Sequence, residues 1–148
     1  MKMRTIAFLS MTLLATILLG AFFAQTLAQT TLPINVVFDP KSYTWDGTPP
    51  PWNAEIWRQK IQDRADYATI KLEDLYTAVT VTPAIHGPRL IVNFSGTDVK
   101  EAIFAKISHM GILYPGVYNI KLKVSGNLLP AYGGDPFEGY GKLTVTVP

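Results

Sequence analysis

The clearest hydrophobic pattern in the chain runs from Tyr114 to Ser125, in the sequence YPGVYNIKLKVS. Pro115 and Gly116 form a dipeptide typical of turns, and apolar and polar residues alternate strictly after it. An alternation with a period of two predicts a β-strand with one buried face and one solvated face. Such a strand cannot bury its apolar row alone, so we expect other segments to pack against it. The predicted buried row is Tyr118, Ile120, Leu122 and Val124.

Short apolar runs separated by turn-forming residues recur through the rest of the chain. This spacing predicts one all-β domain over residues 29–148, a sandwich of about seven strands. The run Leu90–Phe94 is apolar almost throughout, so we expect it to be covered on both faces. The connection Gln59–Asp66 is polar and predicts a surface loop. The other predicted strands are Leu32–Phe38, Trp52–Ile56, Tyr67–Leu72, Thr77–Val81 and Leu143–Val147.

One segment has helical rather than strand periodicity. Asp98 is placed to cap its start, and Glu101, three residues later, completes a pattern typical of a capping box. Gly111 suits the position just after a helix end. We therefore expect one short helix that lies across an end or side of the sandwich. The apolar stripe that predicts it is Val99, Ala102, Ile103, Ile107 and Met110.

The first 28 residues differ from the rest of the chain. Lys2 and Arg4 are their only charged residues, and the stretch from Ile6 to Ala24 is apolar or small. A basic start, an apolar run and small residues before Gln29 predict a signal peptide cleaved after Ala28. The apolar run is roughly 19 residues long, close to the length that spans a bilayer, so a retained hydrophobic anchor helix is the alternative. In that case residues 5–24 would contact the membrane. Both interpretations predict an exported protein, extracellular or at the cell surface.

Charge and cysteine content exclude several classes of function. Removing Lys2 and Arg4 from the 13 basic residues leaves 11, which equals the number of acidic residues. A domain with no excess of positive charge has no basic footprint for nucleic acid. The chain contains no cysteine, which rules out disulfides, thiol catalysis and thiolate metal sites. We expect no cofactor.

Three stretches of the domain carry a family resemblance. The triplet FDP at 38–40 opens the domain, and 90–103 joins a strand ending in Phe to a short helix. Residues 115–147 close it with a Pro-Gly turn, a strand and a Phe-Glu-Gly segment. Together they resemble an immunoglobulin-like β-sandwich module of prokaryotic secreted and cell-surface proteins. The resemblance covers most of residues 34–147, while the tryptophan-rich stretch 43–57 departs from it. It implies a fold and a location, and it implies no active site.

Two groups of residues are candidates for modification or binding. Asn93 begins an N-x-S triplet, which in an exported chain is a candidate glycosylation site. Tyr43, Trp45 and Trp57 lie in the densest aromatic stretch and are candidates for a surface that stacks on sugar rings or docks a partner. We expect Trp52, from the same stretch, to lie in the core and Trp45 to be exposed on a proline-stiffened loop.

The sequence contains no catalytic or metal-binding constellation. His86 and His109 have no neighbours at ligand spacing, and no pattern concentrates the loop aspartates around a calcium site. The acidic pairs Glu73–Asp74 and Asp135/Glu138 would suit glycoside hydrolysis only if the fold brought a pair together. We therefore predict a protein that is not an enzyme.

Three hypotheses for function remain open at this stage. The first is a non-catalytic exported module with a structural or binding role. The second is a subunit of an extracellular filament, which self-associates through a retained N-terminal helix or through strand donation to a neighbour. The third is a carbohydrate-binding module that holds surface glycans on its tryptophan-rich loop. The candidate donor strand presents the apolar row Leu32, Ile34, Val36 and Phe38.

Overall fold

The computed structural model describes residues 29–46 and 51–148. The predicted signal peptide or membrane anchor at residues 1–28 lies outside the described residues, as does the tip of the proline-rich loop. The chain divides into two compact units, Met1–Thr30 and Thr31–Pro148, and the fold below is that of the second. No helix among the described residues has the length and apolarity needed to cross a membrane.

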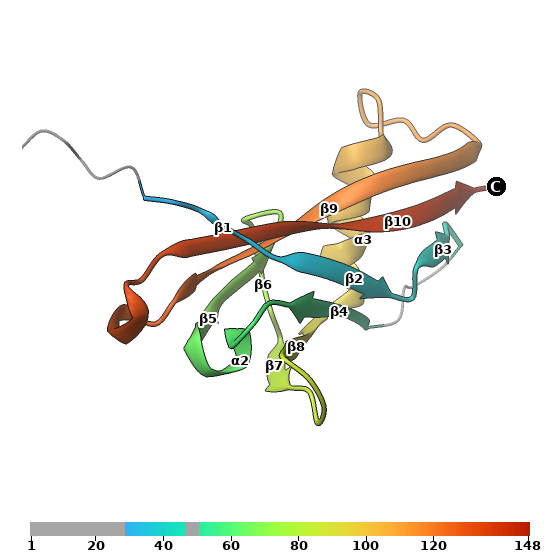
Figure 1. Cartoon of the computed structure of the whole chain (residues 1–148). Coiled ribbons are helices and arrows are strands. Elements are labelled where there is room, and N and C mark those ends of the chain that lie inside the picture. The colour runs from blue at the N-terminus through green and yellow to red at the C-terminus, as the bar shows by residue number, and fades with distance from the viewer. Residues whose placement is uncertain (1–28, 47–50) are drawn as a thin grey trace, which may run out of the picture. The chain divides into compact units, whose positions relative to one another are not determined.

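The described residues form two β-sheets (Figure 1). The four-stranded sheet is antiparallel throughout, in the order β2-β4-β8-β7. Its strands are β2 (Asn35–Asp39), β4 (Trp52–Trp57), β7 (Thr80–Pro83) and β8 (Arg89–Phe94).

The six-stranded sheet is built on the long hairpin of β9 and β10. These two strands pair over twelve residues each, from Asn127 opposite Pro136 to Gly116 opposite Val147. The order is β1-β10-β9-β5-β6, and β3 also pairs with β10. Both β1 and β3 run parallel to β10. The strands are β1 (Leu32–Pro33), β3 (Ser42–Thr44), β5 (Ala65–Leu72), β6 (Tyr76–Thr77), β9 (Gly116–Leu128) and β10 (Pro136–Val147).

The two sheets share one hydrophobic core, which confirms the all-β prediction. On β9, Leu122 and Val124 are fully buried and Tyr118 and Ile120 are half-buried, on the side that the alternation predicts. On β10, Leu143, Val145 and Val147 are buried, as predicted. The sequence predicted about seven strands and one helix, whereas ten strands and two α-helices are described. The extra strands β1, β3 and β6 are only two or three residues long and carry no periodic signal of their own. The largest fully buried side chains include Trp52, Phe38, Phe94 and Phe137.

The predicted first strand is divided between the two sheets. Leu32 pairs with Phe137 of β10, whereas β2 pairs with β4 in the other sheet. Ile34 lies at the crossing, and its N–H donates to the carbonyl oxygen of Glu138 at 2.9 Å. The prediction of one continuous strand is therefore wrong. An alternating row shows which side of a strand is buried, but it does not show which strand is the neighbour.

The approach of β2 to β10 depends on two glycines. A Cβ atom at Gly139 would collide with the carbonyl oxygen of Ile34, and one at Gly141 would collide with the ring of Phe38. Both glycines have ordinary negative-φ or extended backbone conformations. They are therefore required for space rather than for backbone freedom.

Two other predicted β-segments differ in the structure. The predicted strand Thr77–Val81 is split between β6 and β7, which belong to different sheets. The run Leu90–Phe94 is buried on one face only, because Ile91 and Asn93 of β8 point outward and are half-buried. The predicted polar loop before β5 contains a short helix, α2 (Ile61–Arg64), whose first residue is buried in the core.

The predicted helix exists, but its caps are different. Helix α3 (Gly96–Ile107) packs against β9 and buries Val99, Ala102 and Ile103. Its N-cap is Ser95, whose Oγ accepts a hydrogen bond from the backbone N–H of Asp98 at 3.1 Å. Asp98 is therefore inside the first turn, where its charge suits the helix dipole. The helix ends four residues before Gly111. A 3₁₀ turn, η1 (Pro130–Tyr132), later closes the β9–β10 hairpin.

Candidate functional site

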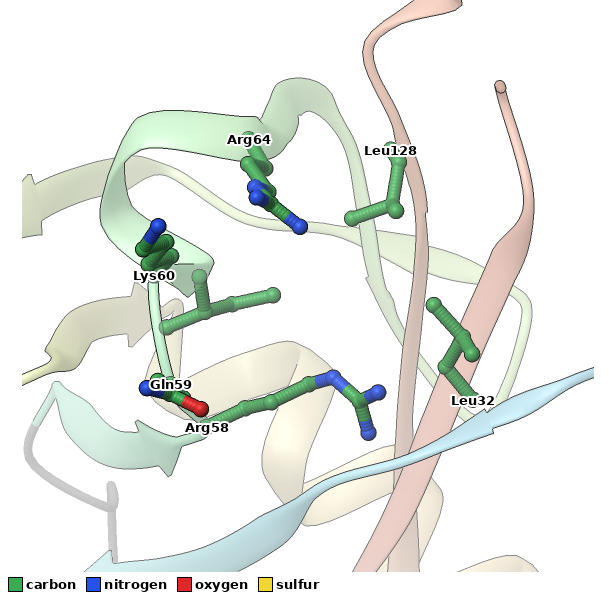
Figure 2. Close-up of a pocket in the computed structure, with 7 residues that line it drawn as sticks. Leu32, Arg58, Gln59, Lys60, Arg64 and Leu128 are labelled. Carbon is green, nitrogen blue, oxygen red and sulfur yellow. The ribbon is translucent and has the colours of Figure 1, made fainter. Parts of the chain in front are cut away.

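The candidate site is a pocket at the end of the domain where α2 meets the β9–β10 loop, which we name the end pocket. It has a volume of about 440 Å³. Figure 2 shows the guanidinium groups of Arg58 and Arg64 pointing toward Leu32 and Leu128. Lys60 lies on the side away from the two leucines (Figure 2). The end pocket is lined by Leu32, Arg58, Gln59, Lys60, Ile61, Arg64 and Leu128.

Backbone hydrogen bonds hold the cationic side of the end pocket in place. The carbonyl oxygen of Arg58 accepts from the N–H of Ile61 at 3.1 Å, which turns the chain from β4 into α2. The carbonyl oxygen of Arg64 accepts from the N–H of Leu129 at 2.7 Å, which ties the helix end to the β9–β10 loop. Lys60, at the start of α2, has a left-handed backbone with φ of 61°, which is uncommon for a residue with a side chain. Two basic residues from one short segment are thus brought beside strands that are distant in sequence.

The two arginine side chains are each fixed by a second contact. Nη1 of Arg58 donates to the carbonyl oxygen of Pro33 at 2.6 Å. The guanidinium of Arg64 lies 5.3 Å from the centroid of the Tyr132 ring, a cation–π geometry. Among the described residues, none of the three cationic groups of the end pocket forms an ion pair. The pocket therefore combines an uncompensated positive charge with an apolar floor.

The lining of the end pocket determines what it can do chemically. It contains no carboxylate, imidazole, hydroxyl or thiol side chain. Arginine and glutamine side chains can bind and orient an anion, but they provide no nucleophile and no general base. The amine of Lys60 is the one potential nucleophile in this lining, and it is exposed on the side away from the two leucines (Figure 2).

The end pocket was not predicted from the sequence, because Gln59, Lys60, Ile61 and Arg64 fall in a segment predicted as a polar connection. The available signal was the segment Arg58–Arg64, which carries three basic residues around an apolar Ile61. An apolar residue inside a polar loop indicates that the loop packs on the core. What could not be read locally is that Leu32 and Leu128 complete the pocket.

The aromatic residues predicted as one surface are separated in the structure. Tyr43 packs edge-on against Trp45 at 5.9 Å and against the buried Trp52 at 5.4 Å. Trp52 is fully buried, as predicted. The expectation that Trp45 is exposed is wrong, because its ring is half-buried under Phe104 and the ammonium group of Lys100.

Trp57 occupies a different surface, the outer face of the four-stranded sheet. It is at the other end of β4 from Trp52 and points to the opposite side of the sheet. The guanidinium of Arg89 lies 4.7 Å from its ring centroid and forms an ion pair with Glu55 at 3.1 Å. Tyr43 and Trp45 therefore form one cluster, and Trp57 does not belong to it.

The glycosylation candidate Asn93 lies on the same outer face. Asn93 is half-buried, precedes the last residue of β8 and lies directly opposite Asn53 of β4. Its Nδ2 donates to Oδ1 of Asn53 at 3.0 Å. A glycan on Nδ2 would therefore have to replace a cross-strand hydrogen bond.

The candidate donor strand is paired within its own chain. Ile34, Val36 and Phe38 are buried in the core, and Leu32 is half-buried and lines the end pocket. Donation of this row to a neighbour would require it to leave these positions.

The acidic pair Glu73–Asp74 has a structural position between β5 and β6. Glu73 Oε1 accepts from the N–H of Lys123 at 2.6 Å, and Oε2 forms an ion pair with Lys106 at 2.9 Å. Asp74 accepts from Ser125 Oγ at 2.7 Å and forms an ion pair with Lys123. These contacts hold the turn between β5 and β6 against β9 and α3, and they give each of the two carboxylates a structural role.

The ion pair of Asp74 predicts a pH-dependent stability. Hydrogen bonds from Lys123 and Ser125 lower the pKa of Asp74 below its ordinary value. A lowered folded-state pKa stabilises the fold above the unfolded-state pKa, and this contribution disappears as the pH falls through the folded-state value. We expect Asp74→Asn to lower stability at neutral pH by less than about 1 kcal/mol, because the side chain is more than half exposed. Asparagine tolerates the left-handed backbone at this position, so the variant tests the charge.

Urea unfolding of both proteins from neutral to strongly acidic pH checks this prediction. The difference in the free energy of unfolding between the unsubstituted protein and Asp74→Asn should approach zero at low pH. A difference that persists at low pH would show that Asp74 acts through geometry rather than charge.

Two lysines face each other directly on the outer face of the six-stranded sheet. Lys121 of β9 is the register partner of Lys142 of β10, and both are exposed. Lys41 lines the same shallow surface, which we name the lysine patch. Like charges directly opposite in a sheet are destabilising.

Reversing one of these charges should stabilise the protein. We expect Lys142→Glu to raise the free energy of unfolding by about 0.5 kcal/mol, because it converts a repulsive cross-strand pair into an attractive one. Urea unfolding at low salt measures the gain, which should shrink at high salt through screening. Lys142→Gln is the control and should show a smaller gain. No gain in either variant would show that the two ammonium groups avoid each other.

The histidines and acidic residues form no metal site among the described residues, where no group of three or more potential ligands occurs. His86 and His109 are both exposed, and they lie in different loops.

Comparison with protein-family models, with curated proteins and with solved structures returned no match.

Proposed function

We propose that this chain is an exported, non-catalytic immunoglobulin-like module with a binding role. The export part of the proposal comes from the basic and apolar pattern of residues 1–28. The fold part comes from strand order, and the binding part comes from the end pocket.

The strand order supports the immunoglobulin-like assignment. An immunoglobulin sandwich has strands A, B, E and D in one sheet and G, F and C in the other, with C′ added in variable-type domains. The order β2-β4-β8-β7 corresponds to A-B-E-D, and β10-β9-β5-β6 corresponds to G-F-C-C′. In chain order these strands follow the same sequence from A to G.

A local feature at the start of β9 supports the same assignment. The hydroxyl of Tyr118 donates to the carbonyl oxygen of Tyr114 at 2.8 Å. This resembles the tyrosine corner at the start of strand F, where a tyrosine hydroxyl bonds back to the preceding backbone. The chain departs from antibody domains in two respects. It has no cysteine pair, and its buried tryptophan lies on β4 rather than on the strand corresponding to C.

The observation that carries the binding role is the end pocket, a concave site with two positioned guanidinium groups and no carboxylate partner among the described residues. Arginines are usually solvated or paired, and two that line opposite sides of a pocket with apolar side chains provide positive charge for an anion. The lining favours recognition without chemistry, which agrees with the non-catalytic proposal.

Intact mass and N-terminal sequencing of the native protein test the export part. The measurement compares medium, membrane and cytosolic fractions. A chain that begins at Gln29 in the medium supports a free secreted module, and one that keeps residues 5–28 in the membrane supports an anchored module. A full-length chain confined to the cytosol would contradict export. Extra mass on the peptide that contains Asn93 would identify a glycan.

A filament subunit is the second proposal, and the position of the donor row makes it testable. Because Ile34, Val36 and Phe38 fill the chain's own core, filament growth by strand donation requires exchange between chains. Light scattering at increasing protein concentration should then detect oligomers. A protein that stays monomeric would contradict this version of the filament hypothesis.

A further inference from the structure

We propose that the end pocket binds a small organic anion, with its acidic group held by the guanidinium of Arg64 and its body resting on Leu32, Ile61 and Leu128, while Arg58 on the opposite side of the pocket adds a second positive charge (Figure 2). This inference rests on the binding role proposed above and specifies the class of ligand. The acidic group is a carboxylate, a sulfate or a phosphate, since all three accept hydrogen bonds from a guanidinium fork.

The first argument is charge. The domain after residue 28 carries equal numbers of acidic and basic residues, yet the end pocket collects three basic side chains and no acidic one. Half-buried arginines lose part of their hydration, which favours a counter-charge nearby. Among the described residues no carboxylate lines the pocket or pairs with these arginines, and Asp63 of α2 is exposed, so a bound anion is the natural partner.

The second argument is preorganisation. Arg58 uses one N–H on the carbonyl oxygen of Pro33, which leaves its other donors available. The guanidinium of Arg64 lies over the ring of Tyr132, and a cation–π contact uses none of its N–H donors, so they stay available to a ligand. Both arginines belong to or border α2, whose ends are fastened to Pro88 through Arg58 and to Leu129 through Arg64. Little side-chain entropy then has to be lost when a ligand arrives.

The third argument is shape. A volume of about 440 Å³ falls within the range of small-molecule sites. The lysine patch has three cations as well, but they are exposed, flexible and spread over a sheet face. Because the floor is apolar, a molecule with one acidic group and an apolar, ring-sized body, such as an aromatic acid, suits the end pocket.

Isothermal titration calorimetry with three related aromatic compounds tests the ligand class. The protein is the full chain, in whichever processed form the mass measurement identifies. Benzoate carries a carboxylate, phenyl phosphate carries a phosphate, and benzyl alcohol is the neutral control. Binding of either acid but not of benzyl alcohol supports the proposal, and the tighter binder of the two shows which acidic group the pocket prefers. Absence of binding by both acids, or equal binding of benzyl alcohol, would overturn it.

Arg64→Gln tests the site, because it removes the charge and the fork while keeping a polar, unbranched side chain. It should weaken binding of the acid at least about tenfold, since a hydrogen bond between charged groups is worth a factor of this order. Arg64→Lys keeps the charge and should also weaken binding, because an ammonium group cannot form the paired contact.

Lys142→Gln is the matched control. It removes the same charge from the lysine patch, does not touch the end pocket and relieves a repulsive pair, so it should fold well. Its affinity should be within about twofold of the unsubstituted protein, since only a distant screened charge is lost. Equal weakening by Arg64→Gln and Lys142→Gln would overturn the proposal in favour of unspecific attraction. These outcomes are independent of the export test, because the cell fraction that contains the protein does not affect its affinity for small organic acids.

Discussion

Alanine at position 139 is expected to destabilise the protein by about 3 kcal/mol or more, among the largest effects of any single methyl group in the chain. The added Cβ atom would collide with the carbonyl oxygen of Ile34 and would lie 2.7 Å from Cγ1 of the Ile34 side chain. Neither atom can move freely. The N–H of Ile34 is bonded to Glu138, and its side chain is buried where the chain crosses between the sheets. The clash could therefore be removed only if β2 moved away from β10.

Urea unfolding followed by far-UV circular dichroism measures this effect. Gly111→Asn is the control, because Gly111 has a φ of +81° and no atom within 4 Å of an added Cβ. Asparagine adopts that backbone readily, so we expect a loss below about 1 kcal/mol. If Gly139→Ala proved as mild as this control, the close crossing of β2 over β10 would be wrong.

Replacement of Trp52 by alanine is expected to cost about 3–5 kcal/mol, the usual range for removing a fully buried tryptophan. Trp52 is completely inaccessible to solvent. Its Nε1 donates to the carbonyl oxygen of Pro40 at 2.7 Å, and its ring receives the edge of Tyr43 at 5.4 Å. The substitution would leave a cavity, an unpaired carbonyl and a β3 segment without its anchor. A loss of this size is a large part of the stability of a typical domain.

Trp57→Ala is a matched control for this prediction, because it removes the same side chain from the other end and opposite face of β4. Trp57 is half-buried beneath Arg89, so we expect a cost of about 1 kcal/mol from lost packing and cation–π attraction. Thermal unfolding of both variants gives the comparison. Similar losses in the two would contradict the assignment of Trp52 to the core and of Trp57 to the surface.

Both predictions test how β2 and the residues after it pack against the six-stranded sheet. Gly139 and Gly141 let β2 lie close against β10, while Trp52 and Tyr43 hold the chain after β2 against the six-stranded sheet. Both substitutions would lower stability equally if β2 came from a neighbouring chain. Stability measurements therefore test where β2 packs, and the oligomeric state shows which chain provides it.

The sequence alone determined which residues are buried on the strands and the helix with strong periodicity. On β9, β10 and α3 the apolar spacing by itself identifies the buried face, because the period of a strand or helix follows from local backbone geometry. The exception is Met110, the last residue of the predicted helical stripe, which lies beyond the end of α3 and is exposed. The absence of cysteine also excludes disulfides and thiol chemistry without any structure.

Tertiary structure decided how these elements are connected and where a site forms. The row Leu32–Phe38 and the stretch from Tyr76 to Pro83 each cross between sheets, since the choice of neighbouring strand depends on partners distant in sequence. Ser95 rather than Asp98 caps α3, because the cap is set by where the preceding strand β8 ends. The end pocket forms only where one basic segment meets β1 and β9. Its physical basis is the convergence of side chains that no local pattern relates.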